Sequence, residues 1–422
     1  MEGSISNLKP GEMRRSGWLE RFLEPRVLSA VTGWKDGELA VVLPDGRRLS
    51  FGPRDGKRAE IHIHDANFYR RLVLGGDIGI GESYMAGEWS SPDLPALICA
   101  FIRNRAHIAL DVQGVFAVPL RVFNWMLHLL RRNTERGSER NIHAHYDLGN
   151  EFYQLFLDES MAYSSAIFPK EDASLEEAQR HKYDTICSKL QLGPDDHLLE
   201  IGSGWGGLAI HAARTTGCRV TTITISQAQL EGATRRVAEA GLSDRIEVRY
   251  RDYRKVEGRY DKIVSIEMLE AVGEQYWDTF FGKIDELLAP GGRVLIQVIC
   301  VPDVRFASYG PASDWIRKYV FPGGRLPSLY ELQRSVRRST LLETLGVEEI
   351  GVHYAPTLRV WRERFFQNVE TVRRLGFGES FVRLWDFYLA SCEASFSMHW
   401  NRNIQLLLGP PASPMFCKRT GD

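Results

Sequence analysis

The stretch that decides the fold is Leu198–Gly207, LLEIGSGWGG, an apolar run that ends in an acid and passes directly into glycines. The apolar run predicts a buried parallel strand, and residues 208–215 predict the helix that follows it. Gly202, Gly204 and Gly206 allow a sharp bend and a close approach to a ligand beneath the helix N-terminus. The spacing E-x-G-x-G-x-G differs from the G-x-G-x-x-G of dinucleotide sites. It suits a ligand with an amino-acid tail and no pyrophosphate, such as S-adenosylmethionine (SAM); a tight turn without a ligand is the alternative.

The residues that follow repeat this alternation of strand and helix. The pattern predicts strands at 219–225, 245–250, 261–266 and 293–299, helices at 226–240 and 275–288, and an antiparallel edge from 349–353 and 403–408. Alternation at this spacing is typical of an α/β fold with a doubly wound, mostly parallel sheet. Ligands of such sheets bind outside the carboxyl ends of the strands. We therefore expect the functional residues at those strand ends and in the adjoining loops.

The composition narrows the classes of function. Hydrophobic residues make up 44% and charged residues 25% of the 422 residues, and the net charge is −1, whereas a general nucleic-acid binder would be strongly basic. The six cysteines form no C-x-x-C pair, which argues against a zinc site or a disulfide framework and fits a reducing cytoplasm. Residues 1–17 lack a secretory apolar core, and no apolar run approaches the ~20 residues that span a bilayer. We therefore expect no metal, no nucleic-acid partner and only peripheral membrane contact.

Breaks in the pattern divide the chain into five segments. These are a flexible N-terminus (1–16), a small α+β domain (17–132), a polar linker (133–140), a catalytic domain (141–409) and a C-terminal tail (410–422). In the first domain, residues 37–46 predict a hairpin with a Pro-Asp-Gly turn, and residues 67–74 predict a helix. The apolar stretch 118–130, which is followed by two arginines, either docks on anionic lipid or packs against the neighbouring domain. The composition of this stretch favours packing against the neighbouring domain.

Four motifs together point to a known family. They are HYD at 145–147 with MAYS at 161–164, EIGSGWGGL at 200–208, TISQAQ at 224–229, and FPGG at 321–324 followed by YAPTLRVW at 354–361. With these motifs the chain resembles the cyclopropane-fatty-acid synthase family, which includes the mycolic-acid methyltransferases. The resemblance is dense over residues 140–410 and loose before them. It implies a class I SAM-methyltransferase domain with a seven-stranded sheet, preceded by a smaller α+β domain that docks on lipid.

The resemblance implies a reaction with strict physical demands. The alkene carbons of an unsaturated fatty acyl chain in membrane phospholipid attack the sulfonium methyl of SAM, and a carbocation forms on the chain. A base then removes a proton from the added methyl, and ring closure gives a cyclopropane fatty acid. Such a site must exclude water, hold the base within hydrogen-bond reach and stabilise the cation with electron-rich groups.

The same resemblance assigns the residues that bind SAM. The three glycines of the loop surround its methionine part, and Tyr163 and Ser164 close over it. The other contacts lie at the ends of the first three strands, at Glu200, Trp205, Thr224, Ile225, Ser226, Gln229, Asp252 and Tyr253. For Asp252, a cap on a turn is the structural alternative.

The base site is where this sequence departs from the family. The family holds a bicarbonate ion, thought to act as the base, with a cysteine, a glutamate, a histidine, a tyrosine and a backbone group. The glutamate and the tyrosine map to Glu270 and Tyr354, and the backbone group to Ile299. The cysteine and histidine positions hold Ser165 and Gln297. These neutral groups can form hydrogen bonds, but they cannot supply the charge of an imidazolium.

These departures leave the fate of the cation open. Either bicarbonate binds more weakly and the product is still a cyclopropane, or the proton leaves elsewhere and the product is methyl- or methylene-branched. Glu270 would be the base in the second case, and a methylene-branched product would bring in a reductase partner. His145, in the first motif, is also assigned to the catalytic site.

Two other functions are less favoured. They are methylation of a small unsaturated acceptor, and lipid binding by a relative that has lost catalysis. The intact glycine loop, Glu270 and Tyr354 argue against loss of catalysis. We expect unsaturated phospholipid chains as partners, a homodimer, and a cytoplasmic protein that is peripherally associated with the inner face of the membrane.

Overall fold

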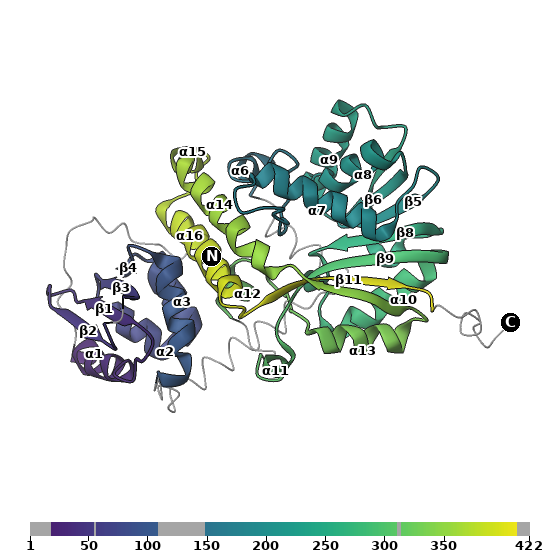
Figure 1. Cartoon of the computed structure of the whole chain (residues 1–422). Helices are drawn as coiled ribbons and strands as arrows, with labels where there is room; N and C mark the ends of the chain where they lie inside the picture. Colours follow the sequence, from purple (N-terminus) through teal and green to yellow (C-terminus); the bar gives the residue numbers. More distant parts are fainter. Residues whose placement is uncertain (1–17, 55, 109–147, 310–313, 412–422) are drawn as a thin grey trace, which may run out of the picture. The chain divides into compact units, whose positions relative to one another are not determined.

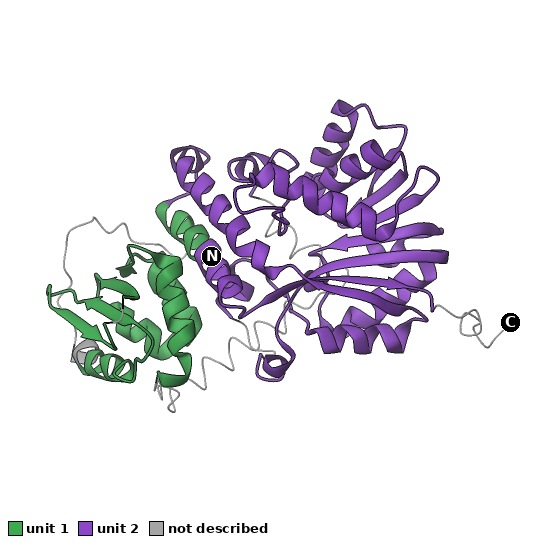
Figure 2. Cartoon of the chain, viewed as in Figure 1, with its two compact units in different colours: residues 1–122, 379–387 green, residues 123–378, 388–422 purple. Residues whose placement is uncertain are grey.

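The computed structural model describes residues 18–54, 56–108, 148–309 and 314–411 (Figure 1). The predicted linker at 133–140 and the apolar stretch at 118–130 lie outside the described residues. The chain divides into two compact units, drawn in different colours in Figure 2. The first unit comprises residues 1–122 and 379–387, and the second comprises 123–378 and 388–422.

The first unit contains a four-stranded sheet with the strand order β2-β1-β3-β4. The predicted hairpin at 37–46 is confirmed, because β1 pairs antiparallel with β2 and Gly46 turns between them with φ +86°. The predicted helix at 67–74 is longer than expected, since α2 continues to Met85 through a kink at Gly76. The elements are α1 (Trp18–Ala30), β1 (Glu38–Val42), β2 (Arg48–Phe51), β3 (Arg58–Ile63), α2 (Asn67–Met85), β4 (Trp89–Ser90), α3 (Leu94–Asn104) and η1 (Arg105–His107).

Residues 379–387 belong to the first unit because they pack on Tyr84. The hydroxyl of Tyr84 donates a hydrogen bond of 2.5 Å to Asp386, and its ring lies 5.5 Å from the ring of Phe387. Arg383 donates to the carbonyl oxygen of Tyr84 at 3.3 Å. These residues form the first half of α16 (Glu379–Ser397), so one helix contributes to both units.

The second unit is built on the predicted seven-stranded sheet, with the order β10-β11-β9-β8-β5-β6-β7. Strands β5 to β9 run parallel to one another, and β11 and β10 extend the sheet antiparallel beyond β9. The strands are β5 (His197–Ile201), β6 (Arg219–Thr224), β7 (Ile246–Tyr250), β8 (Tyr260–Ile266), β9 (Leu288–Cys300), β10 (Glu343–Glu349) and β11 (Arg402–Gly409). The doubly wound α/β fold expected from the strand spacing is therefore confirmed.

Helices cover both faces of this sheet (Figure 1). Helices α10 and α13 pack on one face, and α7, α8 and α9 pack on the other. The helices are α6 (Asn150–Gln154), α7 (Leu175–Leu190), α8 (Gly207–Thr216), α9 (Gln227–Glu239), α10 (Trp277–Leu287), α11 (Asp303–Phe306), α12 (Trp315–Tyr319), α13 (Leu329–Ser339), α14 (Tyr354–Gln367), α15 (Val369–Arg374) and α16, with short turns η2 (Tyr253–Lys255), η3 (Leu269–Ala271), η4 (Glu274–Tyr276) and η5 (Gly351–His353).

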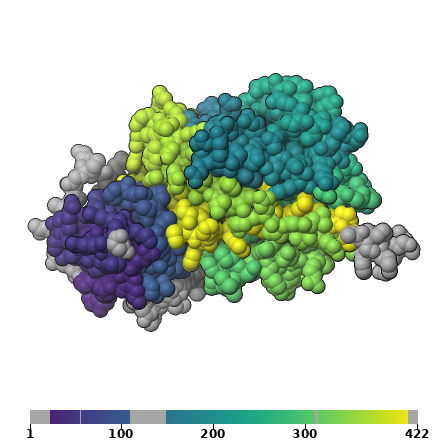
Figure 3. Space-filling view, viewed as in Figure 1, coloured from purple at the N-terminus to yellow at the C-terminus, as the bar shows by residue number. Residues whose placement is uncertain are grey.

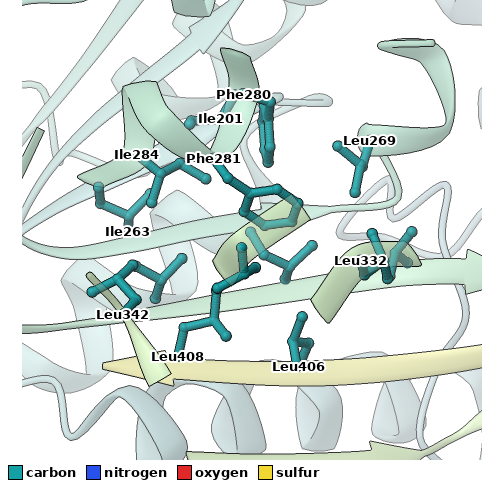
Figure 4. Close-up of a cluster of buried hydrophobic side chains, with 14 of the residues drawn as sticks. Ile201, Ile263, Leu269, Phe280, Phe281, Ile284, Leu332, Leu342, Leu406 and Leu408 are labelled. Atoms are coloured by element: carbon teal, nitrogen blue, oxygen red, sulfur yellow. The ribbon is translucent and has the colours of Figure 1, made fainter. Parts of the chain in front are cut away.

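Apolar residues of α10 and α13 meet the sheet in a continuous core (Figure 4). Phe280, Phe281 and Ile284 of α10 are fully buried, as are Leu406 and Leu408 of β11. Burial of side chains of this size stabilises the fold by about 1.5–3 kcal/mol each. Strand β11 is mostly buried between β9 and β10. In the space-filling view, yellow patches mark the C-terminal part of the described chain, to which both α16 and β11 belong (Figure 3).

Strand β10 corrects the predicted edge of the sheet. The strand expected at 349–353 is wrong, because the chain pairs with β11 through Glu343–Glu349 and then turns in η5. Most side chains of β10 are exposed at this outermost position. Its sequence, ETLGVEE, holds only two apolar residues, Leu345 and Val347, and both are exposed, so it gives little of the apolar signal of a half-buried strand.

We predict that Gly232→Ala destabilises the protein, although alanine is the better helix former. A Cβ at Gly232 in α9 would lie 2.6 Å from Cδ1 of the buried Trp205. Relief of this overlap should lower the free energy of unfolding by about 1–3 kcal/mol, measured by denaturant titration. Gly282→Ala in α10 is the matched control, because the nearest atom lies at an ordinary 3.6 Å. An unchanged or raised stability of Gly232→Ala would contradict the close packing of α9 on Trp205.

Candidate active site

The glycine loop lies between β5 and α8, at the carboxyl end of the parallel strands. Gly202, Gly204 and Gly206 adopt φ values of 100°, 47° and 82°, which side chains with a Cβ rarely adopt. The N–H groups of Gly202 and Ser203 donate to the carbonyl oxygen of Ile223 at 3.0 and 2.9 Å and tie the loop to β6. The loop leads into the N-terminus of α8, where backbone N–H groups favour a carboxylate. This arrangement fits the amino-acid part of SAM.

Two other residues of the loop motif have partners within the protein. Glu200 is buried and accepts a hydrogen bond of 2.6 Å from Thr222 on β6, and burial raises the pKa of its carboxyl to about 8. The indole N–H of Trp205 donates to Asn150 at 2.7 Å, and its ring lies 5.0 Å from that of Tyr153. The hydrogen bonds of these two side chains therefore anchor the glycine loop to the interior of the protein. No role for Asn150 was predicted from the sequence.

The expected cofactor residues after β6 are brought together. The hydroxyl of Thr224 donates to the side-chain oxygen of Gln229 at 2.8 Å and accepts from the N–H of Ser226 at 3.1 Å. Ser226 caps α9 by accepting from the N–H of Gln229. Ile225, between them, is half-buried. The turn is thus fixed by its own side chains beside the glycine loop.

Asp252 and Tyr253 follow β7 in the turn η2. Asp252 accepts from the N–H of Arg254 at 3.0 Å and pairs with the Arg254 guanidinium at 2.8 and 2.5 Å. Burial acts to raise the pKa of Asp252, but the bonds from Arg254 outweigh it and hold this pKa below its usual range. Asp252 therefore caps the turn, as the structural alternative supposed. The buried hydroxyl of Tyr253 has no hydrogen-bond partner among the described residues, which suits a polar atom of a ligand.

Tyr163 and Ser164 lie in the loop that precedes α7. The ring of Tyr163 stacks on Trp361 at 5.4 Å, and its hydroxyl lies 3.0 Å from that of Tyr388. The hydroxyl of Ser164 accepts a hydrogen bond of 2.8 Å from the ammonium of Lys182, which is fully buried on α7. Lys182 was not singled out from the sequence.

The base site is organised around Glu267, for which no role was predicted from the sequence. Its Oε1 accepts hydrogen bonds from the N–H of Ser165 at 3.0 Å, from Gln297 at 2.9 Å and from Asn403 at 2.6 Å. Its Oε2 accepts from the hydroxyl of Tyr354 at 2.7 Å. The structure thus brings Ser165, Gln297 and Tyr354 together as predicted, but on the side chain of Glu267.

The backbone of Glu267 is held in an unusual conformation. This residue directly follows β8 and adopts φ +48°, a left-handed value that costs about 1–3 kcal/mol for a residue with a Cβ. Its N–H donates to the carbonyl oxygen of Gln297 at 2.8 Å, which fixes the turn. Such strain persists only where surrounding contacts impose it, and it is often found at functional sites.

Glu270 lies in η3, one short turn after Glu267. Its Oε1 accepts from the N–H of Ile299 at 2.5 Å, and its buried Oε2 has no hydrogen-bond partner among the described residues. Burial first, and then the charge of Glu267, raise the pKa of Glu270 to about 8. Both effects favour the neutral form of this carboxyl. The predicted pairing of Glu270 with Ile299 is present, but Ser165, Gln297 and Tyr354 bind Glu267.

Aromatic rings lie beside this cluster of carboxyl groups. Tyr354 stacks on Phe396 at 4.5 Å and meets Trp361 edge to face at 6.1 Å. Burial, followed by the nearby Glu267, raises the pKa of the Tyr354 phenol well above its usual value, so it remains a hydrogen-bond donor. The faces of such rings can stabilise a positive charge.

The residues present do not fit a bicarbonate ion. The N–H of Ser165, the amide of Gln297 and the hydroxyl of Tyr354 already donate to Glu267, and the N–H of Ile299 donates to Glu270. The donors that the family uses for the ion are thus occupied by carboxylates of the chain itself. His145 lies outside the described residues.

The described part of the chain offers neither a metal site nor a membrane-spanning helix. No group of three or more His, Cys, Asp or Glu side chains there is arranged to hold a metal ion. None of its helices combines the length and the apolarity that crossing a membrane would demand.

Comparison with known proteins identifies the family. A family model described as mycolic acid cyclopropane synthetase matches residues 133–406. The chain belongs to this family. It is a SAM-dependent methyltransferase of the cyclopropane synthase type, as the glycine loop and the motifs around it predicted.

Relatives across the family match most of the chain. Tuberculostearic acid methyltransferase UfaA1 of Mycobacterium tuberculosis is 38% identical over 391 residues, which cover 88% of each protein. Cyclopropane-fatty-acyl-phospholipid synthase of Escherichia coli is 34% identical over 351 residues, which cover 82% of this chain and 86% of the relative. The solved structure of mycolic acid cyclopropane synthase CmaA1, in complex with SAH and CTAB, is 29% identical with a TM-score of 0.60, and covers 64% of this chain and 98% of that one.

We predict that Asn150→Ala destabilises the protein and weakens SAM binding, because it removes the side-chain oxygen that accepts the 2.7 Å hydrogen bond from the indole N–H of the buried Trp205. The expected fall in the free energy of unfolding is about 1–3 kcal/mol, measured by denaturant titration, and SAM affinity is measured calorimetrically. Gln227→Ala, an exposed amide on α9, is the control and should change stability by less than about 0.5 kcal/mol. Equal behaviour of the two variants would mean that Asn150 does not support the loop.

Proposed function

We propose that this protein transfers a methyl carbon from SAM to the double bond of an unsaturated fatty acyl chain in membrane phospholipid. We further propose that Glu267 is the base and that the product carries a methylene branch in place of a cyclopropane ring. The observation that carries this proposal is the carboxylate of Glu267. It accepts hydrogen bonds from the groups that would otherwise donate to bicarbonate.

The hydrogen bonds of Glu267 indicate which oxygen would take the proton. A carboxylate has about four lone-pair sites, two on each oxygen. Oε1 already accepts from Ser165, Gln297 and Asn403, whereas Oε2 accepts only from Tyr354. Oε2 therefore retains a lone pair, and we assign it as the atom that receives the proton.

The proposed chemistry balances without a further reactant. One alkene carbon of the substrate forms a bond to the methyl carbon, and the bond from that methyl to sulfur breaks with its electron pair left on sulfur. The other alkene carbon becomes cationic. A hydride then moves to it from the methyl-bearing carbon, and loss of a methyl proton to Glu267 forms a terminal C=CH₂ bond. Loss of the same proton before the hydride moves would close a ring.

The placement of the base supports the branched product. A carboxylate that is fixed by four donors and has one open lone pair on Oε2 can take the proton from only one direction. Deprotonation is then less able to compete with hydride migration, which needs no base. The 38% identical relative that is named a methyltransferase gives further support, while the name of the 34% identical relative supports the ring.

Reduction of the branch would need another protein. A saturated methyl branch contains one hydride and one proton more than the methylene branch, and SAM supplies neither. We therefore propose that a separate reductase acts on the product wherever a saturated methyl branch is formed.

The first test compares two glutamates. Glu267→Gln should retain SAM binding and lose turnover by about 10²–10⁴-fold, the usual contribution of a positioned acid–base group. Glu270→Gln should lose far less, because burial raises the pKa of Glu270 and favours its neutral form, and an amide oxygen can keep the hydrogen bond from the N–H of Ile299. Turnover is measured with SAM and vesicles of unsaturated phospholipid. A large loss in Glu270→Gln together with an active Glu267→Gln would assign the base to Glu270.

The second test concerns the product, read by lipid mass spectrometry after expression in a host with unsaturated phospholipids. We expect a gain of one CH₂ with an alkene retained; the same gain without an alkene would establish a ring. The triple variant Ser165→Cys, Gln297→His and Glu267→Gly should shift the product toward the ring and make turnover respond to added bicarbonate. Glycine is chosen because residue 267 has φ +48°. An unchanged product in this variant would show that these three positions do not decide the fate of the cation.

A further inference from the structure

Two large apolar side chains are exposed where the helices α11 and α13 meet. Val304 on α11 is 92% exposed, although valine is among the residues most often found inside proteins. Tyr330, the second residue of α13, is 62% exposed. The two segments are neighbours, because the N–H of Tyr330 donates to the carboxylate of Asp303 at 3.0 Å. Both helices lie on the same side of the sheet (Figure 1).

The short helix α11 is anchored to the second unit by Phe306. The ring of Phe306 lies 6.3 Å from the ring of the buried Trp277, and the guanidinium of Arg325 lies 5.0 Å from the centre of the Phe306 ring. These contacts fix α11 from the inner side. The exposure of Val304 is therefore a property of an anchored helix, and it calls for an explanation from the surroundings of the protein.

Two segments lead from the base site to these exposed residues. The N–H of Ile299 donates to the carboxyl of Glu270, and Val304 follows Ile299 by five residues, which span at most about 18 Å. The N–H of Arg325 donates to the carbonyl oxygen of Glu270 at 2.9 Å, and Tyr330 follows Arg325 by five residues. One leaflet of a bilayer has a hydrocarbon depth of about 15 Å, half of the ~30 Å core. The base site thus lies within a distance of Val304 that is comparable to the length of an acyl chain.

The exposed face of α13 carries three arginines. Arg334, Arg337 and Arg338 are all exposed, and they follow Tyr330 at four, seven and eight residues, the spacing of one helix face. The apolar residues on the opposite face of α13 are buried in the core with α10. Tyrosine and arginine on the exposed side of an amphipathic helix are typical of segments that lie at a membrane interface.

The acidic residues beside these arginines leave their charges accessible. Arg334 pairs with Glu331 at 3.3 Å and Arg338 pairs with Asp278 at 2.9 Å, and both arginine side chains remain about half exposed. Arg337 forms no ion pair with a described residue. Ion pairs at the surface contribute little to stability. The arginines can therefore exchange these partners for the phosphate groups of a lipid surface at little cost.

We propose that Val304, Tyr330 and the three arginines of α13 form a surface, here called the α11–α13 surface, that docks on anionic phospholipid bilayers. This inference rests on the proposed phospholipid substrate, because an acyl chain in a bilayer can reach the base only if the protein lies on the lipid. The two apolar side chains enter the interfacial layer, and the arginines bind lipid phosphates. A protein partner is less favoured, because a stable interface buries ~800 Å² on each partner around an apolar core. The apolar part of the α11–α13 surface consists of two side chains.

The test measures co-sedimentation of the full-length protein with vesicles of phosphatidylcholine, with and without phosphatidylglycerol. A basic residue near an anionic surface contributes about fivefold in affinity, so removal of three should weaken binding to the anionic vesicles by about 10–100-fold. The variant is Arg334→Gln, Arg337→Gln and Arg338→Gln. The control makes the same change in net charge on α7, α8 and α9, at the other face of the sheet, and should alter binding by less than about twofold because distant charges are screened. It replaces three exposed arginines, Arg180→Gln, Arg214→Gln and Arg235→Gln.

Two further variants separate apolar insertion from charge. Val304→Ser with Tyr330→Ser should weaken binding to both kinds of vesicle by about tenfold, because apolar contact does not depend on the charge of the lipid. Replacement of the three arginines of α13 by lysine should retain binding within about threefold, since the charge is kept. All of these variants should turn over detergent-dispersed phospholipid as the wild type does, and thermal stability shows that each is folded.

Equal losses of vesicle binding in the α13 triple variant and in its control would overturn the proposal. Unchanged vesicle binding in the triple variant would also overturn it, and a changed oligomeric state in that case would assign the surface to a second copy of the chain. If the triple variant does not fold, Arg337→Gln alone should weaken binding about fivefold, and no loss there has the same meaning. Wild-type protein that binds anionic vesicles but turns over no phospholipid would instead refute the proposed function, independently of the docking surface.

Discussion

The site depends on one half-buried carboxylate whose donors come from four separate parts of the chain. Glu267 is bound by the loop at Ser165, by Gln297 of β9, by Tyr354 of α14 and by Asn403 of β11. A charge removed from water costs several kcal/mol unless it is paired and hydrogen-bonded. These segments therefore satisfy the charge only in one arrangement. The hydrogen bond from Asn403 of β11 to Glu267 thus links the antiparallel edge of the sheet to the base site.

The sequence predicted the parts of the fold that local chemistry determines. The strand before the glycine loop was expected at 198–201 and is observed at His197–Ile201, because a strand buried on both faces must be continuously apolar. The helices α8 and α9 begin within a residue or two of their expected starts, at the glycine turn and at the Ser226 cap. Strand β10 escaped prediction because an exposed edge strand is stabilised by backbone pairing, which leaves no apolar pattern.

The candidate site was predicted only in part, and the reason is geometric. Glu267 and Glu270 both follow β8 and are three residues apart, so their order along the chain does not show which one meets Ser165, Gln297 and Tyr354. In the structure that residue is Glu267, whose backbone is left-handed, with φ +48°. Asn403, which is 136 residues away from Glu267, joins it only because β11 pairs with β9. Contacts that depend on such pairing carry no local signal.

The carboxylate of Glu267 has a consequence for the supply of the base. A base taken from solution is present at a concentration that varies with respiration and with the gas that surrounds the cell. A base on a side chain is present once in every molecule, whatever the dissolved inorganic carbon. The proposed reaction therefore draws only SAM and lipid from its surroundings, and its rate is uncoupled from the carbon dioxide content of the cell.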